Sequence, residues 1–201
     1  MRIGIYGGTF SPIHNGHVQA AKLFMEQMWL DILFVIPTGV SPHKQMSDGA
    51  TSEDRMKMCS LAFEGIDGVI VSDIEILRQG KSYTVDTLRF FSAHPDDRIF
   101  LLCGTDMMMS LDTWKDPEEI FKLCYPVYIR RESDNSLDSQ IIAKISEYKK
   151  KYGKNVVKLT CTPIEISSNQ IRDKIKNGED VSDMLPPQVY EYIKNRGLYL
   201  Q

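Results

Sequence analysis

The sequence predicts an α/β fold with a doubly wound, mainly parallel sheet, and three observations carry this prediction. Short apolar segments alternate with longer segments of helical periodicity along the chain. The apolar segments are mostly continuous, which is typical of parallel strands covered on both faces. Hydrophobic residues make up 42% of the 201 positions, enough for one substantial core. We therefore expect right-handed crossovers and ligands beyond the carboxyl ends of the strands.

The elements follow in order along the chain. Six strands are expected, at residues 2–6, 32–37, 68–73, 98–103, 126–130 and 156–160. Four helices are expected between them, at residues 17–28, 52–65, 82–94 and 136–153, and the second and fourth end at glycine. Residues 38–51 predict a long loop. Two small helices should follow Thr160, so a single domain would have an α/β core (about 1–160) and a C-terminal helical part (about 161–201).

Composition and charge narrow the class of protein. A net charge of −3 argues against a general nucleic-acid binder, which usually carries a basic surface. No apolar segment approaches the length that crosses a bilayer, and the apolar start of the chain is too short for a signal peptide. The four cysteines form no CxxC pair, and three lie in or beside apolar segments. We therefore expect buried free thiols and a reducing cytoplasm.

The first candidate motif lies where the first strand gives way to a helix. Gly7 and Gly8 let a ligand come close to the backbone, and Thr9 offers a hydroxyl and an amide. His14 and His17 are three residues apart at the start of the helix, whose free amides form an anion site. These features favour phosphate binding. A plain structural turn is the alternative, and a metal site would need a third ligand that no nearby His or Cys supplies.

A second candidate motif opens the C-terminal helical part. Ser167 or Ser168 caps a helix that carries Arg172 in its first turn. The same hydroxyls and amides can instead hold a phosphate, with the arginine as a forked donor. A simple capped helix with an exposed arginine is the alternative interpretation.

Further candidates lie between these two motifs. Asp106 follows Gly104 at the end of the fourth strand, and it either accepts hydrogen bonds from a ribose diol or caps the next helix. Trp114 stands among charged residues, as a partly buried anchor or as a stacking platform for an electron-poor ring. Lys44 in the long loop either neutralises a phosphate or is an ordinary solvated lysine.

These segments resemble one known family. GGTFSPIHNGH (7–17) is similar to the GGTFDPIHxGH signature of bacterial nicotinate-nucleotide adenylyltransferases, of the HxGH nucleotidyltransferase superfamily, with Ser11 where the family usually has Asp. The ISSNQIR segment resembles the superfamily's ISSTxIR signature, with Asn169 in place of Thr. Weaker similarities carry the resemblance from Gly4 to Tyr199: SPHKQ, Arg55 before a methionine, SYTVDTL, GTDMMMSLDTW and LPPQVYEYIKNRGLY. We expect the last of these to pack on the core rather than to act chemically.

The resemblance implies a Rossmann-like nucleotidyltransferase fold and transfer of the adenylyl group of ATP to nicotinate mononucleotide, in NAD synthesis. It implies catalytic roles for His14 and His17. It implies ATP binding by Gly7, Gly8, Thr9, Phe10, Gly104, Asp106, Ser167, Ser168 and Arg172. It implies acceptor binding by Lys44, Thr84, Trp114 and Arg131. Arg131 aligns slightly better than its neighbour Arg130, while Tyr83 and Leu88 are expected to pack.

Mg²⁺ is the expected cofactor, bridging ATP oxygens with few protein ligands, so no residue is assigned to metal. ATP and nicotinate mononucleotide are the expected partners, without nucleic acid or membrane, and a homo-oligomer is allowed. The sequence is compatible with nicotinamide mononucleotide as well. The alternative functions are a related transferase acting on phosphopantetheine or glycerol phosphate, a nucleotide-sensing module without turnover, and a metal-dependent hydrolase.

Overall fold

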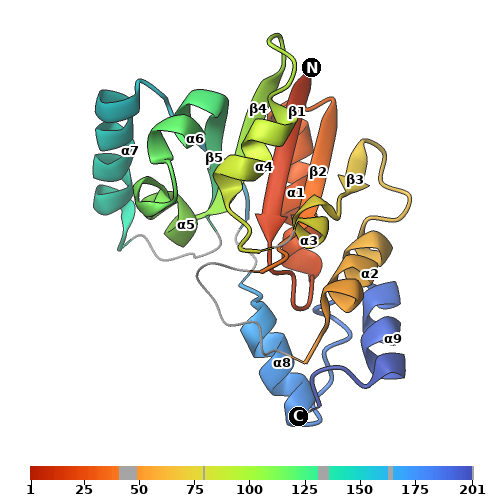
Figure 1. Ribbon diagram of the computed structural model, residues 1–201. Helices are drawn as coiled ribbons and strands as arrows, with labels where there is room; N and C mark the ends of the chain where they lie inside the picture. The colour runs from red at the N-terminus through yellow and green to blue at the C-terminus, as the bar shows by residue number, and fades with distance from the viewer. Residues whose placement is uncertain (41–48, 79, 131–135, 163–164, 201) are drawn as a thin grey trace.

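The computed structural model describes residues 1–40, 49–78, 80–130, 136–162 and 165–200 (Figure 1). One six-stranded sheet has the order β3-β2-β1-β4-β5-β6, and every neighbouring pair is parallel. The strands are β1 (Arg2–Gly8), β2 (Ile32–Pro37), β3 (Val69–Val71), β4 (Arg98–Gly104), β5 (Cys124–Ile129) and β6 (Val157–Leu159). All six expected strands are confirmed, with β1 two residues longer than predicted and β3 reduced to three residues.

The expected helices are also present. They are α1 (Asn15–Gln27), α2 (Ser52–Ala62), α4 (Thr84–Phe91), α7 (Asp138–Tyr152), α8 (Ser168–Lys176) and α9 (Pro187–Arg196). The sequence did not predict α3 (Ile74–Leu77), the 3₁₀ turn η1 (Leu111–Thr113) or α6 (Pro117–Leu123), and it offered α5 (Thr105–Met109) only in the alternative that Asp106 caps a helix. These elements have three to seven residues, too few for a 3.6-residue period to be visible in the sequence.

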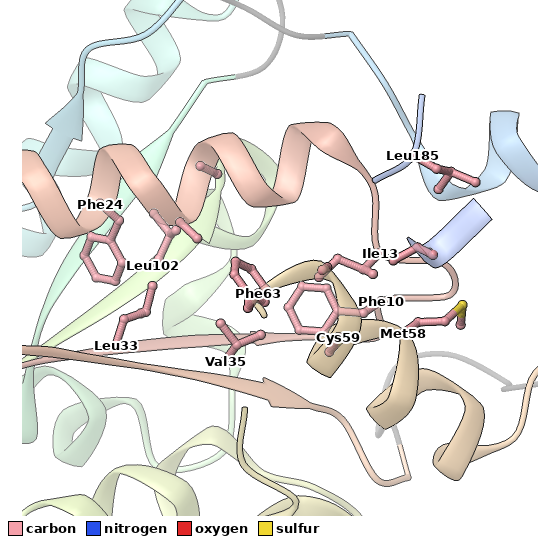
Figure 2. Packing of buried hydrophobic residues seen from close by; sticks show 14 of the residues in the cluster. Phe10, Ile13, Phe24, Leu33, Val35, Met58, Cys59, Phe63, Leu102 and Leu185 are labelled. Carbon is pink, nitrogen blue, oxygen red and sulfur yellow. The ribbon is translucent and has the colours of Figure 1, made fainter. Parts of the chain in front are cut away.

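Helices cover both faces of the sheet, as the continuous apolar strands predicted. Along β4, Phe100 and Leu102 face one hydrophobic core, while Ile99, Leu101 and Cys103 face the other. The first core receives side chains from α1, α2, α8 and α9, and the second from α4, α5, α6 and α7. Figure 2 shows Phe24 of α1 with Met58 and Cys59 of α2 in the first core. The sheet is therefore a central layer, and its inner strands β2, β4 and β5 alternate their side chains between two apolar environments, whereas Ile70 of β3 and Val157 of β6, on the edge strands, are exposed.

The four cysteines fit this layered core. All four are free thiols, of which Cys161 is partly buried and the others, Cys59, Cys103 and Cys124, are buried. Burial raises the pKa of the Cys103 thiol to about 12, and it also raises the pKa of the other three thiols. The expectation of buried free thiols is confirmed for the three in apolar segments.

The order of the strands creates a switch point between β1 and β4. From β1 the chain passes to β2 and β3 on one side, and it then returns to β4 and continues to β5 and β6 on the other side. Adjacent strands that diverge in this way leave a crevice at their carboxyl ends, where α/β proteins bind ligands. Gly8 and Gly104 end these two strands. The arrow of β1 points toward α8, which lies beyond this edge of the sheet (Figure 1).

The C-terminal helices share the first core with the sheet. Ile171 of α8 and both Val189 and Ile193 of α9 are buried in it. Helix α9 lies beside α2 (Figure 1), and the Tyr192 hydroxyl donates to Asp54 Oδ1 at 2.8 Å. Packing of the C-terminal segment on the core, as the sequence predicted, is confirmed at these residues. Within the described part of the chain, no helix is long and apolar enough to cross a membrane.

Candidate active site

The loop between β1 and α1 is held by contacts from distant parts of the chain. It leaves β1 at Gly8, passes through a cis Ser11–Pro12 peptide, and reaches His14, the extended N-cap residue of α1. The buried guanidinium of Arg55 donates from Nη1 to the Thr9 carbonyl oxygen at 3.0 Å. Beyond the loop, the Asn15 amide donates to the Met184 carbonyl oxygen at 3.0 Å. The N-terminus of α1 is thus fixed at the switch point of the sheet.

The two histidines of the first motif stack on each other. Their ring centroids are 3.7 Å apart, and the His14 backbone N–H donates to His17 Nδ1 at 3.3 Å. Because Nδ1 accepts this bond, the proton of the neutral His17 ring lies on Nε2. His17 is partly exposed, whereas the side chain of His14 has no solvent exposure. A phosphate can therefore meet His17 directly, while His14 lies beneath it and can be reached only after a rearrangement.

The two glycines of the motif differ in what the fold requires of them. A Cβ atom added at Gly7 would meet nothing within 4 Å, so packing alone does not explain this glycine. A Cβ atom at Gly8 would lie 2.8 Å from the Phe10 ring. Phe10 has a left-handed backbone (φ 50°) and is 2% exposed, with its ring in the first core beside Cys59 and Phe63 (Figure 2). The ring of Phe10 therefore belongs to the core, and the expected contact of Phe10 with ATP stays a prediction that concerns its main chain.

The second motif lies directly against the first, although they are more than 150 residues apart in sequence. Ser168 Oγ donates to the Pro12 carbonyl oxygen at 2.9 Å. Arg172 donates from Nη1 to the Ser11 carbonyl oxygen at 2.7 Å and from Nη2 to Asn169 Oδ1 at 2.9 Å. The Ser167 hydroxyl caps α8, as predicted, by accepting from the Gln170 amide at 3.1 Å. The N-termini of α1 and α8 therefore meet at one loop, together with a guanidinium group.

A contact that the sequence did not predict closes this side of the site. The hydroxyl groups of Ser11 and Tyr199 are 3.1 Å apart, and both residues are buried. Burial raises the pKa of the Tyr199 phenol and lowers that of the neighbouring Arg55 guanidinium. The bonds of Arg55 go to neutral oxygens, the Thr9 carbonyl and the Ser52 hydroxyl at 3.0 Å each. This buried positive charge contributes to a site suited to anions.

The candidates after β4 stand at the same edge of the sheet. Gly104, in an extended conformation, is the N-cap residue of α5, and Asp106 lies within that helix. The alternative that Asp106 caps the helix is therefore wrong. Its side chain is exposed, so its carboxylate is available to a ligand.

Thr84 and Trp114 belong to neighbouring segments. Thr84 begins α4 after the N-cap residue Tyr83, and Trp114 directly follows η1 as its C-cap residue, partly buried against the second core. Lys115 Nζ lies 4.4 Å from the centre of the Tyr83 ring and so joins the two segments. Leu88 is buried and Tyr83 packs against the same core, which confirms the packing expected of them.

Two predicted site residues, Lys44 and Arg131, lie outside the described residues. Arg130 is buried, and its Nη1 atom pairs with the carboxylate of Asp138. Within the described part of the chain, no group of three or more His, Cys, Asp or Glu side chains could hold a metal ion.

The chain belongs to the cytidylyltransferase-like family, whose model matches residues 5–174. Individual relatives indicate a narrower group within this family. The chain is 38% identical over 197 residues to the "Probable nicotinate-nucleotide adenylyltransferase" of Clostridium acetobutylicum, and the match covers 98% of each chain. It is 34% identical over 208 residues to the protein of the same name from Shewanella woodyi, covering 99% of each. Within the larger family, the chain therefore groups with the nicotinate-nucleotide adenylyltransferases, as its motifs predicted.

A solved structure supports the fold. The nicotinic acid mononucleotide adenylyltransferase of Plasmodium falciparum, complexed with NaAD, superposes with a TM-score of 0.79 at 20% identity. The match covers 98% of this chain and 97% of that one. This likeness confirms the expected Rossmann-like arrangement.

Proposed function

We propose that the protein transfers the adenylyl group of ATP to nicotinate mononucleotide, releasing pyrophosphate and forming nicotinate adenine dinucleotide in NAD biosynthesis. The observation that carries this proposal is the meeting of the N-termini of α1 and α8 at the Ser11–Pro12 loop, with His17 and Arg172 beside them. Two helix N-termini and a guanidinium at the switch point form a site for a polyphosphate. The names of the relatives agree with this activity.

The reaction requires positioning and stabilisation of charge rather than a protein nucleophile. A phosphate oxygen of the mononucleotide attacks the α-phosphorus of ATP, a new P–O bond forms, and the bond to the bridging oxygen of pyrophosphate breaks with its electron pair. The Nε2–H of His17 donates to the oxygens on which negative charge increases. His14 supports that ring by stacking on it, and it would act on the phosphates directly only if a rearrangement exposed it.

Arg172 and the start of α8 are the proposed holders of the β- and γ-phosphates. Arg172 now bonds two neutral oxygens, the Ser11 carbonyl and the Asn169 side chain. Phosphate oxygens are stronger acceptors because they carry charge, so ATP can replace these partners. Ser167 and Ser168 are placed at the same helix end to donate hydroxyl or amide hydrogens. Gly7 and Gly8 at the end of β1, and Thr9 at the start of the following loop, would offer main-chain atoms to the same phosphates.

The nucleosides are proposed to lie along the carboxyl ends of β4 and the helices after it. The carboxylate of Asp106, beside Gly104, is free to accept from the ribose of ATP. Thr84 at the start of α4 and the partly exposed ring of Trp114 would bind the pyridine of the acceptor. Lys44 and Arg131 are proposed to neutralise its phosphate, on the strength of the sequence resemblance alone.

Mg²⁺ is proposed to accompany ATP. Magnesium usually keeps water and substrate oxygens as ligands, so few protein ligands are proposed for it. When bound, the ion would neutralise charge on the phosphates. We also propose a cytoplasmic location, which suits four free thiols.

The test is a pyrophosphate-release assay with ATP, Mg²⁺ and one acceptor at a time: nicotinate mononucleotide, nicotinamide mononucleotide, phosphopantetheine or glycerol phosphate. Release should require the acceptor and be fastest with nicotinate mononucleotide, with the dinucleotide identified by mass. Nucleotide binding without release would indicate a sensing module. Faster release with phosphopantetheine or glycerol phosphate would indicate a related transferase, and either result would overturn the proposal.

A further inference from the structure

A buried carboxylate lies outside the residues discussed so far. Among the described residues, only two acids are buried, Asp54 and Glu75. Asp54 has a structural explanation, because it accepts from the Thr51 amide in the cap of α2 and from the Tyr192 hydroxyl. Glu75 is 7% exposed in the short helix α3, where capping does not explain it. Burial of a carboxylate is unfavourable unless hydrogen bonds compensate for the lost water.

Hydrogen bonds from two other segments compensate the Glu75 carboxylate. The Thr87 hydroxyl of α4 donates to Glu75 Oε1 at 2.8 Å, and Arg78 approaches the same hydroxyl at 3.4 Å. Burial raises the pKa of Glu75, while the Thr87 hydroxyl, the charge of Arg78 and the Ser82 hydroxyl act in the opposite direction. Ser82 Oγ in turn accepts from the Gly39 amide at 3.1 Å, which leaves its own proton for the carboxylate.

The network fixes the chain that leaves β2 against the start of α4. A Cβ atom added at Gly39 would lie 2.1 Å from the Glu75 carbonyl oxygen, so this backbone rests directly on α3. The Ser82 amide donates to the Val40 carbonyl oxygen at 2.8 Å, which makes a second link between the same segments. Ser82 is two residues before Thr84, and Thr87 is three residues after it. The carboxylate therefore holds both flanks of the first turn of α4.

We propose that Glu75 is a positioning residue for the acceptor mononucleotide: its carboxylate ties the chain after β2 to the start of α4 and so sets where Thr84 meets the substrate. The inference rests on the proposed function, because it concerns the same acceptor. Glu75 itself does not touch the acceptor and acts through Ser82 and Thr87. Helix α8 and the histidine loop, where ATP is proposed to bind, have no part in the network.

The test compares Glu75→Gln with Asp54→Asn, a matched loss of charge at the other buried acid. Steady-state kinetics would give kcat and the KM of each substrate. Glu75→Gln should raise the KM of nicotinate mononucleotide about ten-fold, as expected for weakening one charge-assisted hydrogen bond, and should leave the KM of ATP within about two-fold. Asp54→Asn should lower stability without changing the ratio of the two KM values.

A second pair of variants covers the case in which Glu75→Gln does not fold. Thr87→Val removes the hydroxyl and should raise the KM of the mononucleotide selectively. Thr87→Ser keeps the hydroxyl and should leave that KM near the value of the unaltered protein. The inference would be overturned if Glu75→Gln or Thr87→Val changed the KM of ATP as much as that of the mononucleotide, or if Asp54→Asn raised the KM of the mononucleotide selectively. Either result would leave the proposed function intact, provided that the unaltered protein is active. Absence of that activity would instead overturn the proposed function and, with it, this inference.

Discussion

The hydroxyl pair of Ser11 and Tyr199 leads to a quantitative prediction about stability. The two oxygens are 3.1 Å apart, and the residues are 3% and 4% exposed. Removing one hydroxyl leaves the other buried without its partner, which costs about 1–3 kcal/mol. Ser11→Ala and Tyr199→Phe should therefore each destabilise the fold by this amount. The double variant removes both polar groups, so it should cost no more than the milder single variant.

The assay is equilibrium unfolding in urea followed by circular dichroism, with the thermal midpoint as a second readout. For a chain of this size, each kcal/mol corresponds to about 2–4 °C in Tm. Tyr125→Phe is the control, because this tyrosine is 38% exposed, and its change should stay within about 0.5 kcal/mol. Additive costs in the double variant would refute the reasoning, since they would mean that the two hydroxyls do not depend on each other.

Three further predictions concern the site and the core. His17→Ala should lower kcat by on the order of 10²-fold, since one donor to the developing charge is lost, and near-normal turnover at saturating ATP would contradict this role. Trp114→Ala should raise the KM of the mononucleotide far more than that of ATP, whereas equal increases would mean that the ring only packs. In the native protein a thiol reagent should modify Cys161 first, and the three buried thiols should react only after denaturation. Rapid reaction of more than one native thiol would contradict the burial of Cys59, Cys103 and Cys124.

The sequence predicted those parts of the molecule that have a local cause. The inner strands were visible because helices cover both faces of the sheet, which makes β2, β4 and β5 largely apolar along their length. The cap of α8 was visible because a serine before an apolar period is a local signal. Helix α3 was missed because four residues show no periodicity, and with it the sequence analysis missed Glu75.

Within the site, the spacing of the motifs did not determine which way side chains point. The three-residue separation of His14 and His17 predicted one helix face, but not that His14 would be buried beneath His17. Phe10 was assigned to ATP from its place in a motif, whereas its left-handed backbone turns the ring into the core. No local sequence signal predicts the contact between Tyr199 and Ser11, because the two residues are 188 positions apart. Contacts of this kind depend on the completed fold.

That separation of 188 positions also bears on how the enzyme is made. During synthesis the loop with the histidines leaves the ribosome early, long before the residues that brace it have been translated. Ser168 and Arg172 come late as well, so the proposed anion site is assembled only after translation has passed Arg172. A chain interrupted after β6 would keep all six strands of the sheet but lack one side of the site. Incomplete products of translation should therefore be inactive rather than partially active.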